Sequence, residues 1–504
     1  MIFSKSSRKR KKKESSNSDL LDFDLFYQLS YMSAISSAGI QRSQIFERAA
    51  ALPCASAQYF RKVRTLAKNL NYDYAEACRV VGESAKSETV RSLLLRLSGS
   101  LSSGESEDTF LAREAKVQAD IYTNTYERDL ESLKSWTDAY IALIISVVLI
   151  VMVATISTMI YPVGTTFVIG LTVLMIGVSG MGCWLLYRIA PHEVKVHGLE
   201  ITSPEHRLTK KLALWLLPLC AVSCALLFAQ GMDMGKILMA AGVIVFPIGL
   251  LALSNDGKVD KRDGEIGTFL RALGGIGSAI GTTLTEALSR LDIRSIRSLA
   301  PNIKPLQARL SLGLSSTLCW KRFAAETGSE VIRRSVDIFW EAVSIGGEPE
   351  EVGSRTSLYA TSVSHLRAKR KLTSSTFKWL SLGIHAAAVA LLVFIVDIVS
   401  SFSDLVSKLE IRNMDQTSAA AFGGVFAFDF SSIHTLQPVV MLVVVILSVV
   451  DAVAPQVTEG GHSLKFFYYL GATLFVSGLI LVGVPPLVDI IFGNISSVTA
   501  MGGS

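Results

Sequence analysis

The stretches SSGESED, at residues 102–108, and IGGEPEE, at residues 345–351, are two versions of one local pattern. In each, a glycine and a glutamate follow an amphipathic run, and further acids come next. A glycine commonly ends a helix at such a place, and acids favour the first turn of the next helix because the helix dipole is positive there. The two stretches therefore predict the same helix–turn–helix at two distant places in one chain.

The two stretches belong to longer segments that repeat. The segment before the first stretch places four apolar residues on one face of a predicted helix, and a shift of 242 residues finds four more on one face. Beyond them the shift becomes 243, which places a one-residue insertion in a turn, where it is best tolerated. The matched residues are Ser87, Glu88, Val90, Leu94, Leu97, Leu101, Gly104 and Trp136 in the first copy, and Ser329, Glu330, Ile332, Val336, Phe339, Val343, Gly347 and Trp379 in the second.

The chain has 504 residues, half of them hydrophobic, and many of these gather in long blocks with few charges. A helix needs roughly 20 apolar residues to cross a bilayer, and about 17 is the lower end. The blocks run over residues 139–160, 163–187, 212–230, 237–253, 379–396, 436–454 and 466–488. We predict about seven transmembrane helices, although Pro218 and Pro247 leave open a re-entrant hairpin over residues 212–253.

The basic residues are distributed unevenly across these predicted spans. With the N-terminus in the cytoplasm, 46 of the 49 Lys and Arg residues fall on the cytoplasmic side. Cytoplasmic loops are enriched in Lys and Arg, so we predict a multi-pass protein of the cell membrane with its N-terminus inside and its C-terminus outside.

The fold class predicted from these patterns is all-α: a polytopic membrane protein with two duplicated cytoplasmic helical bundles. The predicted segments are a basic disordered tail (1–24), a first cytoplasmic domain (25–138), four spans (139–253) with a cytoplasmic loop (188–211), a second cytoplasmic domain (254–378), three spans (379–492) with an external loop (about 400–435), and an external tail (493–504).

No catalytic, cofactor-binding or metal-binding signature stands out, and we expect no enzyme. GMDMGKI at residues 231–237 resembles a P-loop but is one residue short and lacks the final Ser or Thr. His192, His197 and His206 share one loop, yet their spacing fits no ordinary zinc motif.

Ionisable residues inside the apolar blocks are few. Asp397, Asp451 and Asp489 lie near block ends, and His385 is the only ionisable residue well inside a span. A transporter carries several polar sites near the membrane midplane, so the alternative of a transporter with regulatory cytoplasmic domains is disfavoured. An intramembrane enzyme would need paired acids or a Ser/His pair at matched depth, and the sequence displays neither.

The remaining candidates are charged surfaces that could contact partners. The basic run before residue 379 either follows from the positive-inside rule or attracts an acidic protein. The run Arg8–Lys13 suits anionic lipid headgroups, and we expect no nucleic acid partner. Besides the 188–211 loop, the candidate partner-binding residues are Glu105, Glu348, Arg367, Lys369, Arg370 and Lys371.

These features together resemble a known family. Two helical domains that run through AISSAG (34–39) to SGSLSSGES (98–106) and then into a span are similar to the type II secretion F domain. The paired spans between the domains and the segment DAVAPQVTEGGHSLKFFYYLG (451–471) resemble the archaeal members, the platform proteins of archaella and archaeal type IV pili. The resemblance covers about residues 25–490.

The resemblance implies a non-enzymatic platform beneath a growing filament. Such a platform couples a hexameric secretion ATPase on its cytoplasmic side to the extrusion of pilin-like or archaellin-like subunits, and in archaella to rotation. We expect a homodimer, and a larger assembly stays open. Whether the filament is an archaellum or a pilus stays open.

Overall fold

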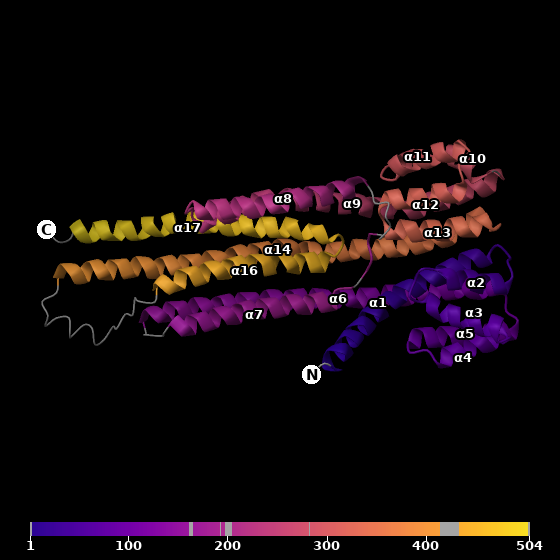
Figure 1. Ribbon diagram of the computed structural model, residues 1–504, viewed down its shortest axis with the longest axis horizontal. Coiled ribbons are helices and arrows are strands. Elements are labelled where there is room, and N and C mark those ends of the chain that lie inside the picture. The colour runs from indigo at the N-terminus through magenta and orange to yellow at the C-terminus, as the bar shows by residue number, and fades with distance from the viewer. Residues whose placement is uncertain are drawn as a thin grey trace. The chain divides into compact units, whose positions relative to one another are not determined.

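The computed structural model describes residues 3–160, 165–191, 193–196, 204–281, 283–413 and 433–501. Within these residues every regular element is a helix, and the only β pairing is an isolated bridge between Val196 and Ser329 (Figure 1). The predicted all-α fold class is confirmed.

The chain divides into two compact units, and four helices contribute to both. Unit 1 comprises Met1–Leu130, Pro191–Arg207 and Asn255–Arg370, and unit 2 comprises Glu131–Ala190, Leu208–Ser254 and Lys371–Ser504. The boundary falls inside α6 (Glu107–Ile160), α8 (Pro204–Ala229), α9 (Met234–Ile280) and α14 (Pro349–Asn413). Both predicted cytoplasmic bundles thus lie mainly in unit 1. Their division into separate domains stays a prediction.

The helix starts in unit 1 confirm the duplication. Helices α2, α4 and α5 of the first copy each begin 242 residues before α10, α12 and α13 of the second, and α3 begins 243 residues before α11. The helices are α1 (Phe3–Ser36), α2 (Arg42–Ala51), α3 (Ala57–Asn69), α4 (Tyr74–Glu83) and α5 (Glu88–Ser103) in the first copy, and α10 (Leu284–Ser289), α11 (Ala300–Ser311), α12 (Ser316–Thr327) and α13 (Glu330–Ser344) in the second, with a 3-10 turn, η1, at Ile293–Ser295.

The repeated glycine turn works as the pattern predicts in the first copy and with a shift in the second. Gly104 ends α5 in the left-handed conformation, with φ of 74°. After α13 the left-handed residue is Gly346, with φ of 103°, whereas Gly347 lies close to the carbonyl of Ala342. Both copies therefore use a glycine to turn the chain, and the inserted residue supplies a second one.

The start of the chain differs from the prediction of a disordered tail. Helix α1 is already formed at Phe3, and its buried face includes Leu21, Phe23 and Asp24. These residues precede the predicted start of the first domain at residue 25. The basic composition of residues 1–13 hid the apolar face that begins just beyond it.

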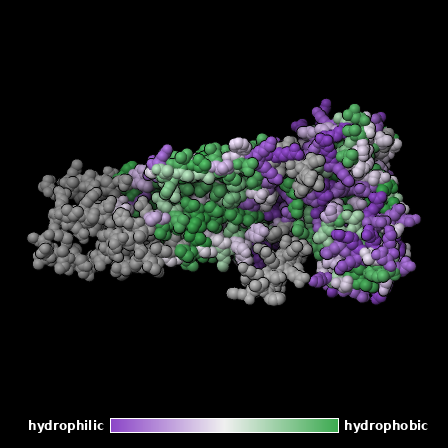
Figure 2. Space-filling view, viewed as in Figure 1, coloured by the Kyte–Doolittle hydropathy of each residue, from purple (hydrophilic) through white to green (hydrophobic). Residues whose placement is uncertain are grey.

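Unit 2 contains the apolar helices. Six helices of the described chain are long and apolar enough to cross a membrane: α6, α8 (Pro204–Ala229), α9, α14, α16 (Ile433–Glu459) and α17 (Phe466–Met501). Figure 2 shows hydrophobic residues over the helices of unit 2, whereas the visible face of unit 1 is mainly hydrophilic. The chain is therefore an all-α polytopic membrane protein.

Three predicted details of unit 2 compare with the structure as follows. Helix α7 (Thr165–Ile189) occupies the second apolar block, but only its part Val173–Ile189 qualifies as a shorter apolar helix, so the seventh span stays a prediction. Helices α8 and α9 are each long enough to cross, which favours two spans over a re-entrant hairpin. Residues 493–501, predicted as a tail, continue α17, and most of the predicted external loop lies outside the described residues.

Helices α9 and α17 meet along a row of glycines. A Cβ added to Gly242 would come within 2.8 Å of the Gly471 carbonyl oxygen, and one added to Gly235 within 3.1 Å of the Gly478 carbonyl oxygen. Gly249 likewise abuts the backbone of Tyr468. The glycines on α9 are spaced by seven residues, as are the two on α17. Small residues at such spacing let two membrane helices approach closely.

Candidate functional site

The predicted cytoplasmic loop after α7 is anchored inside unit 1. Val196 pairs with Ser329 in the isolated bridge, and the backbone nitrogen of Glu330 donates to the Lys195 carbonyl oxygen at 3.0 Å. The bridge thus fixes residues 194–196 against the start of α13. A short segment from far along the chain thereby joins the second helical copy.

Glu193, from this segment, lies at the centre of a buried charge cluster. Arg367 donates to Glu193 Oε2 at 3.1 Å, and Arg370 lies 3.4 Å from Oε1. Arg367 also donates to Asp263 at 2.7 Å and to the Val194 carbonyl at 3.0 Å. All four charged side chains are more than nine-tenths buried. We call Glu193, Asp263, Arg367 and Arg370 the arginine cluster.

Lys195 extends the buried network on the other side of the segment. Its ammonium pairs with Asp256 at 2.9 Å and with Asp260. Burial by itself lowers the pKa of Lys195, but these two carboxylates outweigh it and raise that pKa above its usual value. Burial likewise raises the pKa of Glu193, and Arg367 and Arg370 outweigh it and hold that pKa below its usual value. Both residues are therefore charged at neutral pH.

The lowered pKa of Glu193 predicts a specific pH dependence of stability. A carboxylate whose folded pKa lies below its unfolded value contributes stability above the unfolded value, about 4.3, and loses it as pH falls through the folded value. We expect the free energy of unfolding to fall less between pH 5 and pH 3 for Glu193→Gln than for the unsubstituted protein. Urea unfolding at a series of pH values measures this, and equal slopes would contradict it.

The two helical copies are joined by a second set of charges, of which Arg334, Asp24 and Glu330 are buried. Arg334 on α13 donates to Asp24 on α1 at 2.7 Å and to Glu330 at 2.8 Å. Its guanidinium carbon lies 4.4 Å from the ring centre of Phe23 and 4.7 Å from that of Tyr27. Arg355 on α14 pairs with Asp108 on α6 at 2.6 Å. The two copies therefore form one unit through specific, charged contacts, and a cation over aromatic faces strengthens them.

The candidate partner-binding residues occupy different environments. Arg367 and Arg370 are buried in the arginine cluster, and Lys369 pairs with Glu127 while remaining partly exposed. Lys371 is exposed. Glu105 pairs with Arg113 at 2.9 Å, and Glu348 is exposed and accepts from Ser278 at 3.0 Å. Their role in binding a partner stays a prediction.

Unit 2 contains a buried polar chain that sequence inspection did not assemble. His385 on α14 lies with Nδ1 2.7 Å from Asp451 Oδ2 on α16 and with Nε2 2.8 Å from Ser477 Oγ on α17. Tyr140 on α6 donates to Asp451 Oδ1 at 3.2 Å, and Ser448 Oγ lies 2.9 Å from Ser477 Oγ. The expectation that no Ser/His pair lies at matched depth is therefore wrong, because residues 92 positions apart meet across two helices.

This arrangement ties helices together and offers no room for a substrate. Ser477 and Ser448 have no exposed surface, and His385 has almost none. When His385 is neutral, Nδ1 donates to Asp451 and Ser477 donates to Nε2. When it is charged, Nε2 donates to Ser477, Ser477 to Ser448, and Ser448 to the Val444 carbonyl at 2.7 Å. Each of these hydrogen-bonded side chains thus has a partner in either state of His385, as buried polar groups require.

We expect the protein to lose stability when only one partner of the His385–Asp451 hydrogen bond is removed. Asp451→Leu leaves the His385 Nδ1–H and the Tyr140 hydroxyl without their acceptor, which costs about 1–3 kcal/mol for an unsatisfied buried donor. The double variant His385→Leu, Asp451→Leu removes that orphaned donor and should recover part of the loss. Thermal unfolding of the unsubstituted protein and the two variants in detergent tests this, and a double variant no more stable than Asp451→Leu would contradict it.

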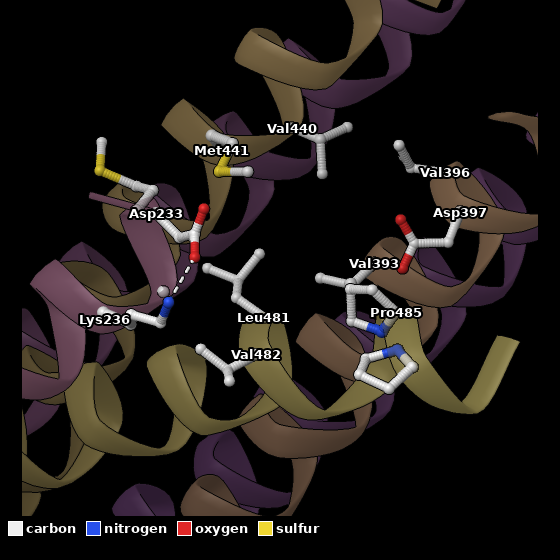
Figure 3. A pocket seen from close by; sticks show the side chains of 13 residues that line it. Asp233, Lys236, Val393, Val396, Asp397, Val440, Met441, Leu481, Val482 and Pro485 are labelled. Atoms are coloured by element: carbon white, nitrogen blue, oxygen red, sulfur yellow. Dashed lines mark ion pairs between the residues drawn. The ribbon is translucent and has the colours of Figure 1, made fainter. Parts of the chain in front are cut away.

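Unit 2 also contains a cavity of about 440 Å³ (Figure 3). Valine, leucine, methionine and proline side chains line most of it, together with Asp397 and the ion pair between Asp233 and Lys236 at 2.8 Å. The P-loop-like sequence therefore builds a cavity wall and the glycine contact with α17, and Lys236 holds a carboxylate.

No metal site is found among the described residues: no three His, Cys, Asp or Glu side chains there are arranged to hold an ion. His192, His197 and the side chain of His206 lie outside the described residues.

Comparison with known proteins adds to this picture. Residues 29–155, which include most of the first helical copy and the apolar part of α6, match the family described as Type II secretion system (T2SS), protein F. The chain is 23% identical over 432 residues to a protein named Flagella accessory protein J from Methanocaldococcus jannaschii, covering 83% of this chain and 75% of that one. It is also 23% identical to the protein of the same name from Methanococcus voltae, covering 84% and 77%. No solved structure matches. The predicted resemblance to archaeal F-domain platform proteins is confirmed.

Proposed function

We propose that this chain is the membrane platform of an archaellum or type IV pilus-like assembly machine, on which a cytoplasmic secretion ATPase acts to extrude pilin-like subunits. The observation that carries the proposal is the duplication: the first copy matches the protein F family, and the second copy repeats its helices at nearly constant spacing. The similarity to two flagella accessory proteins over most of the chain supports the same conclusion.

The internal contacts support a mechanical role. A platform that transmits an ATP-driven movement has to keep its parts together under load. Unit 1 joins its two copies through Arg334 and Arg355, and holds the segment before α8 through the arginine cluster. These contacts hold distant parts of the chain together. We expect the protein to be a non-enzymatic component that acts as a homodimer in the cell membrane, with its N-terminus in the cytoplasm.

Deletion of the gene in the source organism tests the proposal. We expect surface filaments to disappear from electron micrographs, while the filament subunits accumulate in the membrane. The plasmid-borne gene should restore the filaments, and purified protein should retain the secretion ATPase of the same organism. A deletion strain with normal filaments would refute the platform function and would favour the alternative of a transporter.

A further inference from the structure

Two turns in unit 1 share an unusual feature at equivalent positions. The α3–α4 turn contains Leu70, Asn71 and Tyr72, and the α11–α12 turn, 242 residues later, contains Leu312, Gly313 and Leu314. Among the described residues, Asn71 is the only non-glycine residue with a positive φ, at 55°, and its counterpart Gly313 has φ of 72°. The backbone nitrogens of Leu70 and Leu312 both donate to the carbonyl four residues earlier. The two turns therefore share a left-handed residue at the same position. We call them the paired leucine turns.

The large apolar side chains of both turns are exposed. The exposed fractions are 59% for Leu70, 44% for Tyr72, 77% for Leu312 and 53% for Leu314. A single exposed apolar residue on a protein surface needs no explanation. Left-handed surface turns, however, ordinarily carry glycine and small polar residues. Apolar side chains on both sides of the left-handed residue, in both copies, indicate that these turns contact something.

The helices that lead into the turns carry only positive charge. Helix α3 contains Arg61, Lys62, Arg64 and Lys68, α11 contains Lys304 and Arg309, and neither helix contains an acid. Lys68 and Arg309 each pair with a glutamate of a neighbouring helix, whereas Arg61, Lys62 and Lys304 point to solvent. An apolar tip beside such cations fits a surface with apolar side chains and carboxylates, since opposite charges guide and hold a complex.

The surroundings of the turns favour a protein over a lipid surface. Helices α4 and α5 are joined by four residues and pack along each other, so the start of α4 lies at the end of α5 (Figure 1). Helices α12 and α13, which are joined by two residues, also pack along each other, so the start of α12 lies at the end of α13. The paired leucine turns thus share their end of unit 1 with the acid-rich starts of α6 and α14. These carry Glu105, Glu107, Asp108, Glu348, Glu350 and Glu351, so acids and the cations of α3 and α11 lie at the same end. A protein surface can place its carboxylates opposite the cations alone, whereas a continuous layer of anionic headgroups would also face the acids.

We infer that the paired leucine turns are the docking points of a cytoplasmic protein whose contact surface combines apolar side chains with carboxylates. This inference rests on the proposed function, in which the secretion ATPase is that protein. Because the two turns differ in their second apolar residue, Tyr72 against Leu314, each half of the platform would contact its own site on the partner.

Binding of the secretion ATPase to the full-length protein in nanodiscs tests the inference. We expect the variant Leu70→Asn, Tyr72→Ser, Leu312→Asn, Leu314→Asn to raise Kd by about tenfold or more, the change that 1.4 kcal/mol produces. Its melting temperature should stay unchanged, because the four side chains are exposed. The matched control is Leu95→Asn, which alters a leucine of α5 that is 38% exposed and whose counterpart is Asp337. The control should bind like the unsubstituted protein.

The outcomes separate this inference from the proposed function. If the unsubstituted protein and the fourfold variant bound the ATPase equally, the docking points would be overturned and the platform function would stand. No binding by the unsubstituted protein would refute the proposed coupling, and the docking points with it. Two further results would overturn the inference by showing another occupant. One is quenching, by spin-labelled lipids, of a fluorophore on Leu312→Cys. The other is dissociation of a dimer by the four substitutions, measured by light scattering.

Discussion

Replacing Arg367 by alanine is expected to lower the free energy of unfolding of unit 1 by about 3–5 kcal/mol, the usual effect of removing one partner of a buried ion pair. Asp263 would lose its guanidinium partner, Glu193 would keep only Arg370 and the Tyr126 hydroxyl, and the Val194 carbonyl would lose its donor. Two carboxylates would then stay buried with too little positive charge. Because Glu193 and Val194 belong to the segment before α8, we also expect this segment to become accessible to proteases.

The same helix supplies the control for this prediction. Lys369 pairs with Glu127, and both side chains remain partly exposed, so Lys369→Ala should change stability by no more than about 1 kcal/mol. Urea unfolding followed by tryptophan fluorescence measures both, since Trp320 is buried in unit 1 and stacks on Trp340. Equal unfolding midpoints for Arg367→Ala and Lys369→Ala would show that the arginine cluster does not stabilise the unit.

Substitution of Gly242 is expected to force α9 and α17 apart. A Cβ at this position would lie 2.8 Å from the Gly471 carbonyl oxygen and 2.8 Å from the Phe475 nitrogen. Both are backbone atoms that cannot rotate away, so the helices themselves must move. We expect Gly242→Ala to cost about 1–3 kcal/mol, in the range of overpacked cores, and Gly242→Leu to cost more.

Gly483 on α17 provides the matched control, because nothing lies within 4 Å of a Cβ added there. We expect Gly483→Leu to keep the melting temperature of the detergent-solubilised protein, and Gly242→Leu to lower it or to abolish recovery of folded protein. If the Gly242→Leu and Gly483→Leu variants had the same melting temperature, the glycine row would not be the contact that sets the distance between α9 and α17.

The sequence predicted part of this contact and of the candidate site. The seven-residue spacing of glycines on both helices is visible in the sequence, but nothing local indicates that α9 meets α17. Arg367 and Arg370 stood out for their charge beside a span, and the sequence left open whether they mark topology or bind a partner. The structure shows them buried against Glu193, which lies 174 positions from Arg367. A count of charges along the sequence does not distinguish these two cases, because it does not show which side chains lie next to the arginines.

The polar residues of unit 2 give the same lesson. His385 and Asp451 were each recognised as ionisable residues in apolar blocks, and each was treated alone. Their pairing brings together α14 and α16, and Ser477 adds α17. A serine inside an apolar block carries no signal by itself, so only the packing of the helices identifies it as part of a chain.

The sequence by itself determined the all-helical class, most of the spans, the duplication and its turns. These depend on the 3.6-residue periodicity, on block length and on glycine at left-handed positions, all of which act within a few residues along the chain. Only the tertiary structure decided that the two copies form one unit, that the segment before α8 joins it, and which charges are buried as partners. Such contacts link residues tens to hundreds of positions apart. Their free energy comes from removing particular groups from water together, which local sequence does not encode.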